Sequence, residues 1–209
     1  MSNSADLASC ESADIKRRIL ELIEGASSIA ISGHTSPDGD ALGSVLGLGL
    51  SLMKVFPDKD IALLLADDDP VPRIYRFMEG ADLLVPASAY TGNPDLFISV
   101  DVPVVERLNN SAEVLRRSAH VACFDHHPAR EEFAEVSLRC VNAAACAMII
   151  DRFFGRLWHY RKRQHRHLPA VRPGHRHRSF SVSERRRRRV SCRLASGGAR
   201  CRVRRGVRV

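Results

Sequence analysis

The residues best suited to chemistry lie in two short strings. Residues 33–40 read Gly-His-Thr-Ser-Pro-Asp-Gly-Asp, and residues 125–127 read Asp-His-His. Carboxylates are preferred by hard ions such as Mg²⁺, and imidazole shifts the preference toward Mn²⁺ and softer ions. Two such ions held close together can hydrolyse a phosphoester. The mixed set of side chains therefore predicts a metal-dependent phosphoesterase, with Mn²⁺ favoured and Mg²⁺ as the alternative ion.

The elements around these strings are predicted from hydrophobic patterns. Apolar runs predict strands over residues 28–32, 61–65, 96–100 and 120–124. Helical spacing predicts a first helix ending near residue 25 and further helices over 41–56, 71–78 and 104–117. This alternation is typical of an α/β fold with a doubly wound, mainly parallel sheet.

Three of the predicted strands end at the residues of interest. In a doubly wound sheet, ligands gather at the carboxyl ends of the strands. The first, third and fourth strands are followed by acids and imidazoles: His34, Asp38 and Asp40, then Asp101, then Asp125, His126 and His127. We expect Gly39 to let the backbone turn sharply, so that Asp38 and Asp40 both face inward and each serves a different metal.

Each motif has a simpler alternative. An Asp-Gly-Asp turn often contributes only turn chemistry and a helix N-cap, here at Asp40. A single histidine such as His34 is commonly a hydrogen-bonded structural residue. The joint placement of the motifs at strand ends favours the metal site.

Other features favour a structural interpretation. The glycines at positions 43, 47 and 49 do not form a dinucleotide-binding fingerprint, and we expect them to be small contacts between a helix and the sheet. Residues 67–70, Asp-Asp-Asp-Pro, are expected to form a solvated loop and helix start rather than a third metal site.

The motifs together resemble those of the DHH family of phosphoesterases. Residues 34–44, 99–101 and 125–128 look like the first three motifs of that family, over a likeness that runs roughly from Ile15 to Phe154. Within the family the chain is most similar to the bacterial bifunctional oligoribonuclease and phosphoadenosine-phosphate phosphatase group.

The resemblance implies a role for each site residue. His34 and Asp38 would bind one Mn²⁺, Asp40 and His126 would bind the other, and Asp101 would bridge the two. His127 would contact the scissile phosphate, and Asp125 would orient its neighbours.

The resemblance also implies partners. The substrates would be short oligoribonucleotides or 3′-phosphoadenosine nucleotides, hydrolysed by a two-metal mechanism. The intact family form is compatible with a homodimer.

The likeness stops before the end of the chain. The family's fourth motif, an Asp within a Thr-Asp-Thr-Gly-Arg-Phe-like string, is missing, and so is the C-terminal substrate-binding domain. We therefore divide the chain into a partial DHH domain at residues 1–155 and an Arg- and His-rich tail at residues 156–209. A chain lacking these parts is expected to be weakly active or inactive.

The tail differs sharply in composition from the preceding domain. Up to residue 151 the chain has 12 Lys and Arg against 23 Asp and Glu, whereas beyond it 20 Lys and Arg face a single Glu. Three interpretations compete: a nucleic-acid-binding arm, a disordered segment without function, and a frameshifted translation product. The first would make the protein a noncatalytic, sequence-blind nucleic-acid binder.

The frameshift interpretation is the one we favour. Back-translation of residues 156–190 with free choice of synonymous codons, read one base later, permits a string that contains Thr-Asp-Thr-Gly-Arg-Phe. The same shift turns alternating Asp and Ala codons into the Arg run at 185–189. The tail is then out of frame, and we expect it to be disordered.

The remaining composition bears on location. The six cysteines show neither a metal-binding pair nor a disulfide spacing, which favours free thiols. The polar, acidic residues 1–13 do not resemble a signal peptide, and no apolar run is long enough to cross a membrane. These features predict a cytoplasmic protein without a membrane partner.

Overall fold

The structure is a computed structural model that describes residues 12–128 and 130–165. The strands are β1 (Ser28–Ser32), β2 (Asp60–Leu65), β3 (Leu84–Pro86), β4 (Leu96–Val100), β5 (His120–Asp125) and β6 (Val136–Arg139). The helices are α2 (Ala13–Gly25), α3 (Gly39–Val55), α4 (Ser111–Arg116) and α5 (Cys146–His165). Four 3₁₀ turns complete the described elements: η1 (Arg73–Tyr75), η2 (Ala81–Leu83), η3 (Ala87–Ala89) and η4 (Val105–Leu108).

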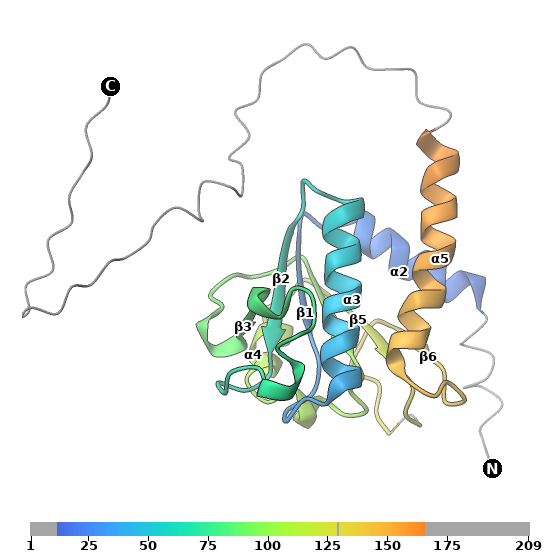
Figure 1. The fold of residues 1–209 in the computed structure, drawn as a ribbon. Coiled ribbons are helices and arrows are strands. Elements are labelled where there is room, and N and C mark those ends of the chain that lie inside the picture. Colours follow the sequence, from blue (N-terminus) through green and yellow to red (C-terminus); the bar gives the residue numbers. More distant parts are fainter. Residues whose placement is uncertain (1–11, 129, 166–209) are drawn as a thin grey trace, which may run out of the picture. The chain divides into compact units, whose positions relative to one another are not determined.

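The strands form a single parallel sheet (Figure 1), in the order β3-β2-β1-β4-β5-β6. This confirms the predicted α/β fold with a doubly wound, mainly parallel sheet. The strand order reverses direction between β1 and β4, which pair directly although β2 and β3 come between them in sequence. Such a reversal opens a crevice at the carboxyl ends of the two strands.

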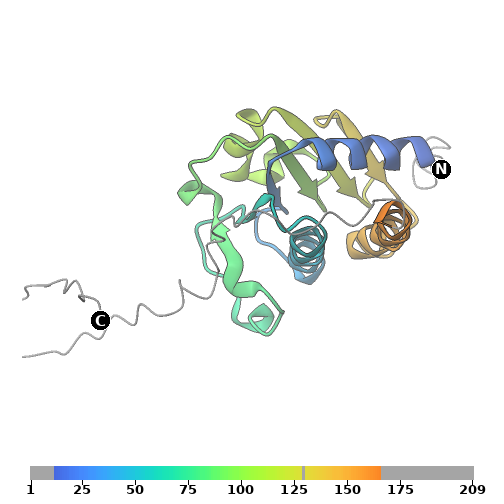
Figure 2. The ribbon, with the colours of Figure 1, turned by 90° about the horizontal axis from the view of Figure 1, so that it is seen from above.

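Alternating side chains divide the core between the two faces of the sheet. Ile29 and Ile31 of β1 face a large cluster that includes residues from α2, α3 and α5, whereas Ala30 faces a smaller cluster with residues from α4 and η3. Figure 2 shows α3 and α5 lying side by side along one face. All five residues of β4 are buried, as expected for a central strand covered on both sides.

Two of the predicted helices are wrong in part. Only the 3₁₀ turn η1 forms within residues 71–78, because a residue that precedes a proline, here Val71, disfavours the helical conformation and Pro72 itself is extended, with a ψ of 139°. The helix predicted over 104–117 is divided into η4 and α4 by Asn109, whose φ of 43° lies in the left-handed region.

Two short strands, β3 and β6, escaped prediction. They have three and four residues and lie at the two edges of the sheet, so neither carries the long apolar run of a central strand. β6 matters for the site, because its last residue is the buried Arg139.

The glycine predictions are also corrected. Of the three glycines expected to touch the sheet, only Gly49 does so closely: a Cβ there would lie 2.2 Å from a methyl of Leu63 on β2. A Cβ at Gly43 or Gly47 would meet nothing within 4 Å.

The predicted boundary between residues 155 and 156 falls inside α5, which continues to His165. The predicted disorder of the remaining tail concerns residues 166–209, which lie outside the described residues. Within the described part of the chain, no helix has both the length and the apolar character needed to cross a membrane.

The cysteines depart in part from the expected free thiols. Cys123 and Cys146 are free and buried, whereas Cys140 is disulfide-bonded. The free-thiol argument for a cytoplasmic location therefore rests on Cys123 and Cys146.

Candidate metal centre

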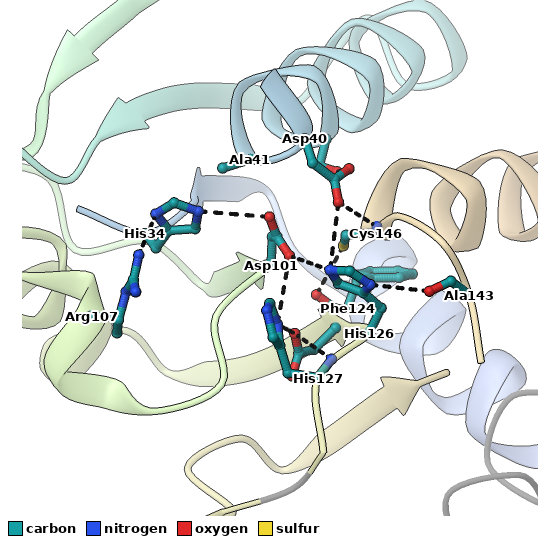
Figure 3. A network of polar contacts seen from close by, with 12 residues as sticks. His34, Asp40, Ala41, Asp101, Arg107, Phe124, His126, His127, Ala143 and Cys146 are labelled. Atoms are coloured by element: carbon teal, nitrogen blue, oxygen red, sulfur yellow. Dashed lines mark hydrogen bonds and ion pairs between the residues drawn. The ribbon is translucent and has the colours of Figure 1, made fainter. Parts of the chain in front are cut away.

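The predicted site residues meet where β1, β4 and β5 end. His34 follows β1, Asp101 directly follows β4, and Asp125 is the last residue of β5. Asp101 occupies the middle of the group, between His34 on one side and His126 and His127 on the other (Figure 3). The site thus lies at the crevice where the strand order reverses.

Asp101 is the shared carboxylate of this group. One of its oxygens, Oδ2, is 3.7 Å from Nε2 of His34, and the other, Oδ1, is 3.3 Å from Nε2 of His126. The residue is only 2% exposed, and its Oδ1 is a buried atom without a hydrogen-bond partner. Burial raises the pKa of Asp101, and the nearby charge of Asp40 raises it further.

The backbone at Asp101 is strained. Its φ of 61° is in the left-handed region, which residues other than glycine rarely adopt. The conformation is stabilised by the Asp101 N–H, which donates to the carbonyl of Phe124 at 2.9 Å. Strained residues of this kind concentrate at functional sites.

His34 and Asp38 lie on one side of Asp101. Nδ1 of His34 is 2.7 Å from the Thr35 carbonyl. Nε2 of His34 faces the carboxylates of Asp101 and Asp38, and it lies 3.9 Å from Oδ1 of Asp38. Asp38 caps α3: its Oδ1 accepts from the Asp40 and Ala41 N–H groups, each at 2.9 Å. These bonds, the one from Ala41 above all, lower the pKa of Asp38 and keep it ionised.

The turn between His34 and Asp40 forms differently from the prediction. Gly39 is the first residue of α3 and does not have a positive φ; Ser36 takes the left-handed conformation instead, with a φ of 50°. The N-cap of α3 is Asp38 rather than Asp40.

Asp40 instead joins α3 to α5. Its Oδ2 accepts from the Cys146 N–H at 2.7 Å, and its Oδ1 accepts from the Ala147 N–H at 3.0 Å. The first N–H groups of a helix have no partner within the helix, so Asp40 satisfies two of them from another element. Its Oδ2 also lies 3.7 Å from Nε2 of His126.

His126 is oriented in the same way as His34. Its Nδ1 is 3.1 Å from the carbonyl of Ala143, so an N–H there leaves the lone pair of Nε2 facing Asp101 and Asp40. Hydrogen bonding of one ring nitrogen to a carbonyl is the usual way in which proteins present the other nitrogen to a metal.

His127 is held by a buried ion pair. Its Nδ1 lies 2.8 Å from Oδ1 of Asp125, whose Oδ2 accepts from Nε of Arg139 at 3.3 Å. Asp125 is fully buried and Arg139 is 4% exposed. Asp125 therefore orients His127 and is itself positioned by a residue at the end of β6.

Besides Arg139, two supporting residues were not predicted from the sequence. Asp67, expected in a solvated loop, accepts from Thr35 Oγ1 and the Ser36 N–H, both at 2.6 Å, and from Asn109 Nδ2 at 2.8 Å. Burial raises the pKa of Asp67, but these hydrogen bonds outweigh it and lower the pKa. Its position just after β2, the neighbour of β1, is the signal that could have identified it.

The second such residue is Arg107 in η4. Its guanidinium reaches back to His34, with Nη2 2.9 Å from Nδ1 of the imidazole (Figure 3). The sequence offered no sign of this contact, which joins residues 73 positions apart.

The donor set fits divalent metal ions. One ligand atom from each of His34, Asp38 and Asp101 lies within 4.8 Å of the others, and the same holds for Asp101, His126 and His127. The two groups share Asp101, and its unpartnered Oδ1 suits a cation. His34 and Asp38 thus group as expected, whereas Asp40 approaches His126 but is also bonded to α5.

Comparison with known proteins finds a similar fold and identifies the family. A structure described as an exopolyphosphatase-related protein from Bacteroides fragilis matches with a TM-score of 0.64 and 21% identity, over 72% of this chain and 45% of that one. The chain therefore spans less than half the length of that protein, and the likeness concerns the fold. The family model for the N-terminal domain of the DHH family matches residues 28–170, and with so much of its length matched the chain belongs to the DHH family.

Proposed function

We propose that this protein is a Mn²⁺-dependent phosphoesterase that uses a two-metal site. The observation that carries the proposal is the buried Asp101, which faces a histidine with each of its oxygens and lacks a hydrogen-bond partner at Oδ1. A carboxylate buried in this way is unfavourable unless a cation compensates its charge. Membership of the DHH family supports a metal-dependent phosphoesterase in general.

Each residue of the site has a proposed role in metal binding. His34 and Asp38 would bind one ion, His126 and Asp40 the other, and Asp101 both. When bound, divalent ions activate water for attack on phosphorus and neutralise the charge that develops on its oxygens. The imidazole nitrogens make Mn²⁺ a better match than Mg²⁺.

His127 is proposed to contact the scissile phosphate. Its ring is 40% exposed, in contrast to the nearly buried ring of His34, and can therefore reach a ligand. Asp125 accepts a hydrogen bond from the Nδ1–H and so directs Nε2 toward the substrate, where a doubly protonated ring would donate from Nε2–H to a phosphoryl or leaving-group oxygen.

The proposed substrates are short oligoribonucleotides and 3′-phosphoadenosine nucleotides, in the cytoplasm. The support is the resemblance of residues 34–44 and 125–128 to the corresponding motifs of the oligoribonuclease and phosphoadenosine-phosphate phosphatase group. The buried free thiols of Cys123 and Cys146 are consistent with that compartment, whereas the disulfide of Cys140 is unusual there.

We also propose that this chain is weakly active or inactive because its C-terminal part is read out of frame. The support is the change from acidic to strongly basic composition after residue 151 and the fourth-motif string permitted by the shifted frame. Sequencing the encoding DNA around residue 155 tests this: an intact frame without displaced family-like sequence would overturn it.

The metal site can be tested separately from turnover. Titration of Mn²⁺ into the full chain by calorimetry should show binding, and Asp101→Asn should weaken it about a hundredfold or more because both ions lose a charged ligand. The matched control is Asp58→Asn, an exposed carboxylate between α3 and β2 that should leave binding unchanged.

Hydrolysis of a dinucleotide and of adenosine 3′,5′-bisphosphate completes the test. We expect slow Mn²⁺-dependent release of product or none, and loss of any activity in Asp101→Asn. Absence of Mn²⁺ binding by the unmodified chain would contradict the metal site. Rapid turnover would contradict only the proposed low activity.

A further inference from the structure

The contact between Arg107 and His34 joins two segments that flank the site. Nη2 of Arg107 is 2.9 Å from Nδ1 of His34 and 3.5 Å from the carbonyl of Thr35. The backbones are joined as well, because the Thr35 N–H donates to the Arg107 carbonyl at 2.7 Å. Arg107 itself is exposed, so its side chain lies at the solvent side of the metal centre.

Nδ1 of His34 faces two partners that make opposite demands. The Thr35 carbonyl, 2.7 Å away, can only accept a hydrogen bond, whereas the guanidinium of Arg107 can only donate one. A neutral imidazole carries one N–H. Nδ1 can therefore donate to Thr35 or accept from Arg107, but it cannot do both.

The choice between these partners decides whether His34 can bind a metal. If Nδ1 accepts from Arg107, the ring proton is on Nε2, which then has no lone pair to offer on the side of Asp38 and Asp101. If Nε2 binds a metal, the proton is on Nδ1 and donates to Thr35. Nη2 of Arg107 would then face an N–H, so its contact with His34 is lost and only the longer contact of 3.5 Å with the Thr35 carbonyl is left to hold the guanidinium.

We propose that metal binding at His34 releases Arg107, whose guanidinium then binds a phosphate group of the substrate. The proposal rests on the proposed phosphoesterase function. The released group is exposed and carries a planar set of donors that matches phosphate oxygens. Its backbone stays bonded to Thr35, so the side chain would turn while its base remains beside the site.

The proposal predicts opposite effects on two binding equilibria. Arg107→Ala removes a competitor for Nδ1, so Mn²⁺ should bind as tightly as in the unmodified chain or more tightly. Inorganic phosphate should bind the Mn²⁺-saturated variant about tenfold to a hundredfold more weakly, because a charge-assisted hydrogen bond is lost. Calorimetry on the full-length chain measures both quantities.

Three further variants make the result specific. Arg107→Lys keeps a charge without the planar donors and should lose only part of the phosphate affinity. Arg107→Gln keeps the stem of the side chain and serves as the second variant if Arg107→Ala does not fold. Arg116→Ala, an exposed arginine of α4 that pairs with Glu113, should change neither affinity.

A spectroscopic measurement reports on the switch without phosphate. In ¹⁵N-detected spectra of the metal-free chain, Arg107→Ala should shift His34 toward the form with its proton on Nδ1. An unchanged ring would mean that Arg107 does not compete for Nδ1, and this would overturn the proposed release.

The outcomes separate this inference from the proposed function. Parallel loss of Mn²⁺ and phosphate affinity in the Arg107 variants would show a purely structural contact, and unchanged phosphate affinity would show that Arg107 does not bind substrate. Failure of the Mn²⁺-saturated chain to bind phosphate would also overturn the inference. If metal and phosphate bind as expected but no phosphoester is hydrolysed, only the proposed catalytic activity fails.

Discussion

Two buried aspartates of the site are stabilised in opposite ways. Asp125 is paired with Arg139 and with His127, so its charge is compensated within the chain. Asp101 has an unpartnered oxygen, and burial raises its pKa. A raised pKa means that the folded state favours the protonated form. The stability contributed by that proton is present below the ordinary pKa of an aspartate and is lost as pH rises through the raised value.

Replacement of Asp101 should therefore stabilise the metal-free chain while it impairs metal binding. Asp101→Asn removes the buried charge, and asparagine tolerates the left-handed φ at this position. At neutral pH we expect the free energy of unfolding without metal to rise by about 1–3 kcal/mol. Urea denaturation measures it, and the gain should shrink below the raised pKa of Asp101. Destabilisation at neutral pH would contradict this account.

Asp125→Asn provides the matched comparison at a second buried carboxylate. Asp125→Asn removes the carboxylate that pairs with the buried Nε of Arg139, whose Nη1 still pairs with Glu132, and it weakens the contact with His127. Because a hydrogen bond to a buried charged group is lost, we expect a loss of about 1–3 kcal/mol in the same denaturation experiment. Opposite changes in the free energy of unfolding would show that the charge of Asp101 is uncompensated without a bound cation, whereas the charge of Asp125 is compensated within the chain.

At the scale of elements, polar side chains from one segment repeatedly fix the start of another. Asp38 caps α3, Asp40 caps α5, and Asp67 joins the loop after β1 to the loop after η4. The last contact involves Ser36 and Asn109, both in left-handed conformations. These bonds fix the loops that carry the candidate metal ligands.

Elements with a local sequence pattern are predictable from the sequence. β1 and β4 were predicted residue by residue, since their apolar runs are continuous. The candidate metal ligands were predicted from their positions after those strands together with the resemblance of their motifs to those of the DHH family. Asp67, Arg107 and Arg139 were not identified because their roles depend on partners distant in sequence: 32 residues separate Thr35 from Asp67, for example.

The close packing of α3 on β2 predicts opposite effects on stability for two glycine substitutions in α3. Gly49→Ala should destabilise the chain by about 1–3 kcal/mol, since the new methyl would collide with Leu63 of β2. Gly47→Ala, where the added methyl meets nothing, should stabilise it by about 0.5–1 kcal/mol. Thermal unfolding of the two variants tests this, and equal effects would contradict the assigned packing.

At the scale of the whole molecule, the described domain and the basic tail suggest different chemistry. The domain places carboxylates and imidazoles at the crevice between β1 and β4. The tail sequence is dense in arginine and lies outside the described residues beyond 165. Noncatalytic binding of nucleic acid is therefore the second candidate function, and the positive charge of the tail is the observation that favours it.

A truncation separates the two candidates. A chain ending at residue 165 should retain Mn²⁺ binding, because every proposed ligand precedes that residue. If the tail binds nucleic acid electrostatically, the full chain should bind single-stranded RNA with an affinity that falls steeply with salt, and the truncated chain should not. Fluorescence anisotropy at several salt concentrations measures this. Binding that survives truncation and requires Mn²⁺ would favour the phosphoesterase site instead.

The order of the strands also has a kinetic consequence. Asp101 contacts His34 and His126, yet β2 and β3 separate it from His34 along the chain, and β5 separates it from His126. The ligands therefore meet only after several parallel strands have paired, a slow step in folding. An ion that binds this late-formed arrangement should act mainly by slowing unfolding, with little effect on the rate of folding. Under the proposed Mn²⁺ dependence, manganese supply would then govern how long each folded copy survives as well as whether it can act.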